Sequence, residues 1–254
     1  MPRLEWLQTN SAGIGVYLAP GVLPEGCAIS SATGAFGQAV SEHAITLMLA
    51  LMKNLPRYRD NQRDGAWRDE GMALSPVGAT ALIIGTGDLG SSIGTTCVAL
   101  GARTVGVRRD PSKPAAGIGE MHGFDELDAL IPTADVIMVC VPGTPETRGL
   151  IDAVRLEAMR RSAILVNVGR GSVIDTDALA RALATGEIRG AAIDVTDPEP
   201  LPAGHPLWSE PRCLITPHVA GGNHLADVPK RIFEIAVANL RRYAKGELPG
   251  NPVQ

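Results

Sequence analysis

Long apolar runs are absent from this sequence of 254 residues. The longest apolar stretches, such as Ala79–Ile84 and Val136–Val141, are far shorter than the roughly 20 residues that a membrane-spanning helix needs. The first residues include Glu5 and do not form an apolar segment followed by a small-residue cleavage site, so they do not resemble a secretory signal. We therefore expect a cytoplasmic protein with no membrane partner.

Paired cysteines and basic clusters are missing as well. The four cysteines are scattered singly, with no CxxC spacing. Reduced thiols are the favoured interpretation, over metal ligands or disulfides, and we predict no metal site. The net charge of −4 comes without a block of Lys or Arg, which argues against a nucleic-acid surface. The expected partner is therefore a small molecule.

Most of the chain alternates short apolar strands with segments of helix length. The 45% hydrophobic content is enough for a sizeable core. Such alternation is typical of βαβ units, and it predicts an α/β fold with a Rossmann-type doubly wound parallel sheet. The predicted strands of this sheet are Thr80–Ile84, Thr104–Val107, Val136–Val141, Ala163–Asn167, Gly190–Asp194 and Cys213–Thr216, and the predicted helices lie near Leu89–Leu100, Phe124–Leu130, Leu156–Met159, Asp175–Thr185 and Asp227–Gly246.

The first part of the chain has a different pattern. Two short strands are predicted at Leu4–Gln8 and Ala28–Ser30, with a turn of small residues between them whose backbone amides could hold an anion. Apolar residues at helical spacing then predict a long helix over 38–59. Pro56 interrupts that pattern, so the helix either kinks there or begins a new segment.

A glycine-rich turn joins the first strand of the predicted sheet to the helix that follows it. Gly85, Gly87 and Gly90 have the GxGxxG spacing, in which the glycines permit a tight turn, close approach of a pyrophosphate and helix–strand packing. The helix N-terminus supplies free amides and a partial positive charge. We therefore predict dinucleotide binding; a purely structural glycine turn is the alternative.

The end of the second strand predicts which dinucleotide is preferred. An acid at this place would bind the ribose 2′-hydroxyl of NAD(H), but the chain has Arg108 and Arg109, whose guanidinium groups suit a 2′-phosphate. This favours NADP(H), with NAD(H) as the alternative. Asp110 follows immediately and could present a carboxylate instead, and two arginines are also common in a solvated loop.

Three polar residues lie just past predicted strands, at the edge where open α/β folds bind ligands. Arg170 lies in VNVGRG, Glu199 in DVTDPEP and His218 in TPHVAG. Together with the glycine turn and the segment VPGTPET at 141–147, these motifs closely resemble the D-isomer-specific 2-hydroxyacid dehydrogenases. The resemblance runs in the family's order from about Leu4 to Val253.

The resemblance implies an NAD(P)-dependent enzyme acting on the CH–OH group of a D-2-hydroxy acid, or on the matching 2-keto acid. His218 would donate the proton to the carbonyl oxygen, since an imidazole titrates near neutral pH. Glu199 would orient this imidazole, and Arg170 would pair with the substrate carboxylate through its planar fork. The structural alternatives are a loop salt bridge for Arg170, a solvated turn acid for Glu199 and a strand-end cap for His218.

The resemblance also implies further contacts. The backbone amides of Ala12 and Gly13 would hold the other side of the substrate carboxylate. Asp194 would hydrogen-bond the nicotinamide carboxamide, with the capping of the next turn as its structural alternative. His43 is interpreted as structural. The cofactor-binding residues expected in full are Gly85, Gly87, Asp88, Leu89, Gly90, Arg108, Arg109, Val141, Pro142, Thr147, Val168, Asp194 and Gly221.

Family members usually carry a further βα segment before the point at which this chain begins. We therefore expect a truncated flavodoxin-like substrate domain, with 1–37 as its remnant and the helix in 225–254 returning to it. Residues 38–224 would form the dinucleotide-binding domain. The helix over 38–59 and the following stretch up to Trp67 are expected to form a dimer arm, as in the family, because so much apolar surface should be covered.

Two functions follow from these patterns. The first is hydride transfer between NADP(H) or NAD(H) and a small 2-keto acid or D-2-hydroxy acid, with a substrate of the glyoxylate or hydroxypyruvate type expected. The alternative is a catalytically impaired dinucleotide-binding or sensor protein of the same fold, which the missing segment favours.

Overall fold

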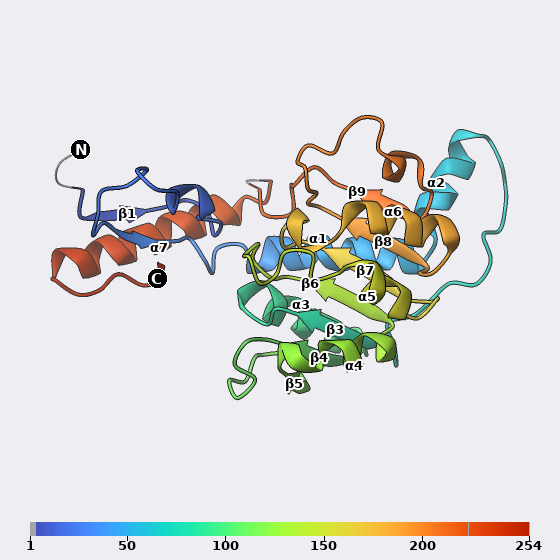
Figure 1. The fold of residues 1–254 in the computed structure, drawn as a ribbon, viewed down its shortest axis with the longest axis horizontal. Helices are drawn as coiled ribbons and strands as arrows, with labels where there is room; N and C mark the ends of the chain where they lie inside the picture. The colour runs from blue at the N-terminus through green and yellow to red at the C-terminus, as the bar shows by residue number, and fades with distance from the viewer. Residues whose placement is uncertain (1–3, 223, 254) are drawn as a thin grey trace. The chain divides into compact units, whose positions relative to one another are not determined.

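The structure is a computed structural model that describes residues 4–222 and 224–253. Its described residues divide into two compact units, one formed from those up to 39 together with those from 221 onward, and the other from 40–220 (Figure 1). The predicted domain ranges 1–37, 38–224 and 225–254 include residues 1–3, 223 and 254, which lie outside the described residues. The assignment of these ranges to a substrate domain and a dinucleotide-binding domain stays a prediction. Among the described residues, no helix is long and apolar enough to cross a membrane.

The larger unit is built on a seven-stranded sheet in the order β5-β4-β3-β6-β7-β8-β9, with every neighbouring pair parallel. The chain starts in the middle at β3, builds outward to β5 and then returns to continue with β6 on the other side of β3. This confirms the predicted doubly wound α/β fold. The strands are β3 Thr80–Ile84, β4 Arg103–Val107, β5 Glu120–His122, β6 Val136–Val139, β7 Ile164–Asn167, β8 Gly190–Ile193 and β9 Cys213–Ile215.

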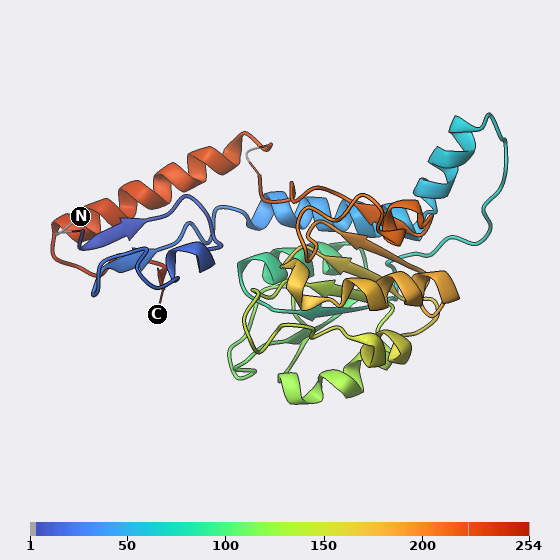
Figure 2. The same cartoon turned by 45° about the horizontal axis from the view of Figure 1, so that its top comes forward.

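Helices cover both faces of this sheet, which explains why its central strands are apolar almost throughout. Every residue of β3, β6, β7 and β8 is buried. Figure 2 shows α1 and α3 on one face and α4, α5 and α6 on the other. The bounds of these helices are α1 Gly37–Met52, α3 Asp88–Ala99, α4 Leu127–Leu130, α5 Ala153–Ala158 and α6 Thr176–Thr185.

The helix predicted over 38–59 is divided into two helices. The chain forms α1 and then a separate helix α2, Leu55–Arg63. Between them Asn54 adopts a left-handed conformation with φ of 56°, and Pro56 follows in the first turn of α2. Proline lacks the N–H that would continue the hydrogen bonds of α1, but it is well tolerated in a first turn. The second of the two alternatives raised by Pro56 is therefore correct.

Smaller differences concern short elements. The sequence pattern did not predict β5, an edge strand of three residues that pairs only with β4. The helix predicted near 124–130 is a 3₁₀ turn, Phe124–Glu126, followed by α4. Helix α5 begins earlier than predicted because the carboxylate of Asp152 caps it by accepting a hydrogen bond from the backbone N–H of Arg155.

The smaller unit consists of a three-stranded sheet and one long helix. The strand order is β1-β2-β10, where β1 is Trp6–Gln8, β2 is Ala28–Ser30 and β10 is Pro252–Val253. Helix α7, Asp227–Ala244, packs on this sheet through the stacked rings of Trp6 and Tyr243, whose centroids are 5.1 Å apart. The buried Asn239 adds hydrogen bonds to the side chain of Gln8 and to the backbone of Gly250.

The four cysteines are free. Burial raises the pKa of the Cys97 thiol to about 11 and those of Cys140 and Cys213 to about 12. These three thiols therefore stay protonated at neutral pH and are poor nucleophiles and poor metal ligands.

Candidate active site

The glycine turn connects β3 directly to α3, in the middle of the sheet where the strand order reverses. Gly87 is the N-cap of α3 and offers no capping side chain, so the amides of the first helical turn have no side-chain acceptor. A Cβ built on Gly87 would meet nothing within 4 Å, whereas one built on Gly90 would collide with the carbonyl oxygen of Gly85. The turn is thus open toward solvent and closed toward the sheet, which suits a bound pyrophosphate.

Arg108 and Arg109 follow β4 at the same edge of the sheet. The guanidinium of Arg108 donates to the carbonyl oxygen of Lys113 at 3.2 Å. The carboxylate of Asp110 accepts a hydrogen bond from the Ser112 hydroxyl at 2.6 Å and pairs with Lys113 at 3.3 Å, and these contacts lower its pKa. Asp110 is therefore occupied within its own loop.

The segment 141–147 lies beyond β6, beside the glycine turn. The Thr147 hydroxyl donates to the carbonyl oxygen of Pro142 at 2.6 Å and accepts from the backbone N–H of Thr144 at 2.9 Å, which closes the loop on itself. A hydrogen bond from Thr144, and to a smaller extent the charge of Arg109, lower the pKa of Glu146. Arg109, which follows β4, therefore lies close enough to the 141–147 loop for its charge to act on Glu146.

Arg170 follows β7 in a turn that the buried side chain of Asn167 holds from both ends. Asn167 Oδ1 accepts from the backbone N–H of Gly169 at 3.0 Å, and Nδ2 donates to the carbonyl oxygen of Arg170 at 3.0 Å. A Cβ on Gly171 would collide with the carbonyl of Thr196, so only glycine lets this turn approach the loop after β8 so closely. The turn that carries Arg170 therefore lies against the loop that carries Glu199.

His218 and Glu199 form a direct pair. Nδ1 of His218 and Oε1 of Glu199 are 2.6 Å apart, and both side chains are a little over two-fifths exposed. A short bond of this kind sets the ring orientation and leaves Nε2 as the nitrogen available to a bound molecule. His218 adopts a left-handed backbone conformation with φ of 52°, which is uncommon for a residue with a side chain and points to a local constraint.

Asp194, at the end of β8, supplies that constraint. Its carbonyl oxygen accepts the backbone N–H of His218 at 2.7 Å. Its carboxylate, 2% exposed, accepts the N–H groups of Val219 and Ala220 at 3.0 Å each and the hydroxyl of Thr216 at 2.6 Å. Asp194 thus bonds the residues before and after His218 as well as the backbone of His218 itself.

His43 and Thr216 also contact Asp194, and the sequence did not predict these contacts. Nε2 of His43, on α1, lies 3.0 Å from the Thr216 hydroxyl and 3.6 Å from Oδ1 of Asp194. Because the Thr216 hydroxyl donates to Asp194, its oxygen is free to accept from His43. The only sequence signal was the polar character of these two positions within apolar segments, since 173 residues separate them.

The remaining expected site residues are distributed between the two units. Val168 is buried directly after β7, at the same edge as Arg170. Ala12 and Gly13 lie in the loop after β1, in the smaller unit, where the Ser11 hydroxyl donates to the carbonyl oxygen of Gly13 at 2.7 Å. Gly221 also belongs to the smaller unit. The cofactor and substrate roles of all these residues stay predictions.

A parallel sheet with an open glycine turn at its strand reversal, and with a paired imidazole and carboxylate at the same edge, is typical of a nicotinamide-dependent oxidoreductase. Comparison with protein-family models agrees with this class and narrows it. Residues 45–220 match the model of the D-isomer specific 2-hydroxyacid dehydrogenase, NAD binding domain. The chain belongs to this family, and its reaction is hydride transfer between a nicotinamide cofactor and a 2-keto or 2-hydroxy acid.

Three relatives illustrate the similarity. The chain is 30% identical to a glyoxylate reductase of Thermofilum pendens, covering 98% of this chain and 74% of the relative. It superposes with a TM-score of 0.88 on a family protein from Aeromonas salmonicida, with 34% identity over 98% of this chain and 78% of that one. A TM-score of 0.88 also relates it to a dehydrogenase from Xanthobacter autotrophicus in complex with NADPH and MES, with 31% identity over 100% of this chain and 78% of that one.

Gly87 has space for a Cβ atom and Gly90 does not, so alanine substitutions at these two positions form a matched pair. Gly87→Ala should fold like the parent protein, since its φ of −78° suits any residue and the Cβ has open space around it. It should nevertheless weaken dinucleotide binding at least tenfold, because the methyl group occupies the place of the pyrophosphate. Gly90→Ala should lower stability by about 1–3 kcal/mol or more through overpacking.

The measurements are thermal unfolding and fluorescence titration with NADPH for both variants. Unimpaired NADPH binding by Gly87→Ala would contradict the placement of the pyrophosphate at this turn.

Proposed function

We propose that the chain reduces a small 2-keto acid to the D-2-hydroxy acid, and that Arg170, Glu199 and His218 are its catalytic residues. The observation that carries this proposal is the 2.6 Å contact between His218 Nδ1 and Glu199 Oε1. It leaves the Nε2 side of the ring to meet the substrate. We propose a substrate of the glyoxylate or hydroxypyruvate type, and the glyoxylate reductase of Thermofilum pendens supports glyoxylate.

Each catalytic group has a distinct task in this proposal. The nicotinamide, when bound, supplies the hydride that reaches C2 of the keto acid. His218 donates a proton from Nε2 to the carbonyl oxygen, and Glu199 keeps the ring in place and stabilises its charged form. Arg170 pairs with the substrate carboxylate. The backbone amides of Ala12 and Gly13 are proposed to hold the other side of that carboxylate.

For the cofactor, we propose that the glycine turn from Gly85 to Gly90 holds the pyrophosphate and that Arg108 and Arg109 read the 2′-phosphate of NADP(H). The occupied carboxylate of Asp110 and the NADPH bound to the relative from Xanthobacter autotrophicus support this preference. The nicotinamide end is proposed to contact Asp194, and the remaining cofactor contacts are proposed at Val141, Pro142, Thr147, Val168 and Gly221.

We also propose a homodimer that works in the cytoplasm. The stretch after α2 exposes apolar side chains that a second copy would cover: Trp67 is fully exposed and Met72 is 85% exposed. Tyr58 and Trp67 line a concavity on α2 and the loop that follows it. The cytoplasmic location is supported by the four unpaired cysteines, which are typical of reducing compartments.

His218→Gln tests the catalytic assignment. Without a proton donor, kcat for glyoxylate and hydroxypyruvate should fall by about 10²–10⁴, while NADPH binding measured by fluorescence titration stays unchanged. His205→Gln is the matched control, because His205 also pairs with a carboxylate, that of Asp177 at 3.2 Å, but lies outside the proposed site. Turnover of His218→Gln at the parental rate would refute the role of His218.

If the parent protein binds NADPH but turns over none of glyoxylate, hydroxypyruvate and phenylpyruvate, the chain is a dinucleotide-binding protein rather than an enzyme.

Cofactor preference is tested by kcat/KM for NADPH and for NADH. We expect NADPH to be preferred, and Arg108→Ala combined with Arg109→Ala to lower kcat/KM for NADPH about tenfold or more through the loss of charge-assisted bonds. The NADH value should change little. Arg103→Met is the control, since Arg103 starts the same strand but pairs with Glu120. A parent protein that prefers NADH would contradict the assignment.

The dimer is tested by size-exclusion chromatography with light scattering. The parent protein should elute at twice the chain mass of 26.6 kDa. Trp67→Ser should shift the equilibrium toward the monomer, because it removes an apolar side chain that only a partner can bury. A parent protein that is monomeric at micromolar concentration would rule out the proposed arm.

A further inference from the structure

A second concavity lies at the amino edge of the same sheet. Three arginines stand shortly before three adjacent strands and line it: Arg161 before β7, Arg189 before β8 and Arg212 before β9. The pocket has a volume of about 280 Å³ and is also lined by Arg57 and Glu70. At about 3.3 Å per residue, the four residues of β8 place this edge roughly 13 Å from the edge that carries the proposed catalytic residues.

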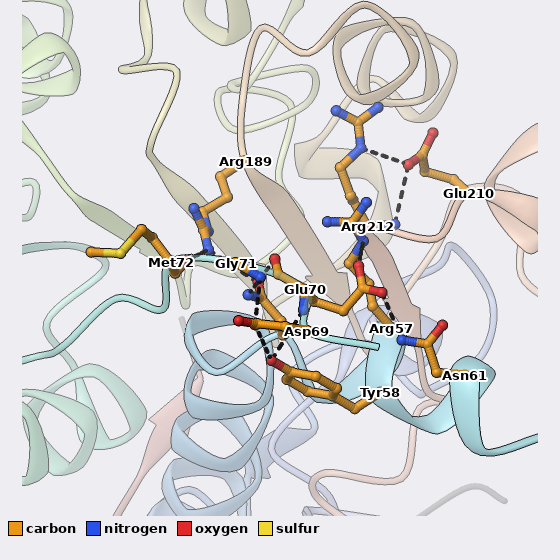
Figure 3. Close-up of polar contacts among 11 residues, drawn as sticks. Arg57, Tyr58, Asn61, Asp69, Glu70, Gly71, Met72, Arg189, Glu210 and Arg212 are labelled. Atoms are coloured by element: carbon orange, nitrogen blue, oxygen red, sulfur yellow. Dashed lines mark hydrogen bonds and ion pairs between the residues drawn. The ribbon is translucent and has the colours of Figure 1, made fainter. Parts of the chain in front are cut away.

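Two of the four arginines are neutralised by nearby carboxylates. Arg57 on α2 pairs with Glu70, with Nε and Oε2 3.2 Å apart. Arg212 pairs with Glu210, with Nε and Oε1 2.9 Å apart. Figure 3 shows these pairs, with Arg57 and Glu70 side by side and Glu210 beside the Arg212 side chain. Their charges are therefore balanced within the protein.

The other two arginines have no such balance. Arg189 Nη2 donates only to neutral oxygens, the Asn54 side chain at 3.0 Å and the Met72 carbonyl at 2.5 Å. Figure 3 shows Arg189 beside Met72. Its Nε is buried and has no hydrogen-bond partner. Arg161 is exposed, and no carboxylate among the described residues pairs with it or with Arg189. The pocket thus carries two positive charges in excess.

An uncompensated guanidinium in a concavity favours an anion that brings its own hydrogen-bond acceptors. We propose that this pocket binds a small organic oxyanion with two or more negative charges, either a phosphate monoester or a polycarboxylate. Arg161 and Arg189 provide the charge, and the volume accommodates more than a bare inorganic ion. Since Arg189 also bonds the Met72 carbonyl, the bound anion braces the segment after α2 against the start of β8.

Isothermal titration calorimetry with inorganic phosphate, glycerol 3-phosphate and citrate tests the site. Arg170 at the proposed catalytic site is also expected to bind anions. Binding is therefore measured in the Arg170→Met variant as well, which lacks the guanidinium of that site. We expect at least one organic anion to bind the parent protein and Arg170→Met with similar affinity. Arg161→Met and Arg189→Met should each weaken binding tenfold or more. Arg63→Met, on α2 but outside the pocket, is the control and should bind like the parent.

The results distinguish the chemical class of the ligand and the site at which it binds. Preference for glycerol 3-phosphate assigns a phosphoryl ligand and preference for citrate a polycarboxylate, and both support the proposal. Binding that disappears in Arg170→Met and persists in Arg161→Met overturns it, as does the absence of binding by all three anions. If Arg189→Met fails to fold, Arg161→Met decides, since its side chain is exposed. A change of oligomeric state in Arg161→Met without a change in anion binding would instead make this pocket part of an interface.

Discussion

The buried carboxylate of Asp194 is the constraint on which the candidate site depends. A charge that is 2% exposed costs several kcal/mol to desolvate unless donors surround it. Here two backbone amides and the Thr216 hydroxyl do so, and all three come from the single turn after β9. The turn cannot relax without leaving that charge unpaired. His218 is therefore held in a left-handed conformation that it would not adopt alone.

The same constraint links elements that are distant in the chain. His43 reaches the Asp194–Thr216 pair from α1, so the helix that covers one face of the sheet also contacts the turn of the proposed proton donor. From the neighbouring strand, the close approach of Gly171 to Thr196 brings the Arg170 turn to the loop that carries Glu199. The proposed catalytic residues thus follow three adjacent strands, β7, β8 and β9, and the loops that carry them contact one another.

Parallel strands also explain why these three strands can carry two chemically different edges. All their carboxyl ends meet on one side and all their amino ends on the other, with a close-packed core between the two. Arg170 and the His218–Glu199 pair lie at the carboxyl edge, and Arg161, Arg189 and Arg212 line the pocket at the amino edge. A parallel sheet therefore separates the proposed chemistry from the proposed anion pocket without a further domain.

Local patterns were enough to predict much of this arrangement. The apolar strands, the glycine turn at Gly85 and the order of the motifs that carry Arg170, Glu199 and His218 identify the fold and family, because each is encoded within a few consecutive residues. Pro56 predicted an interruption in the helix over 38–59, and the structure decided between a kink and the separate helices α1 and α2. Only the tertiary structure showed the edge strand β5, the His43–Thr216–Asp194 contacts and the grouping of Arg161 with Arg189. Those features depend on pairing and on charge compensation between residues far apart in the chain, which no local pattern records.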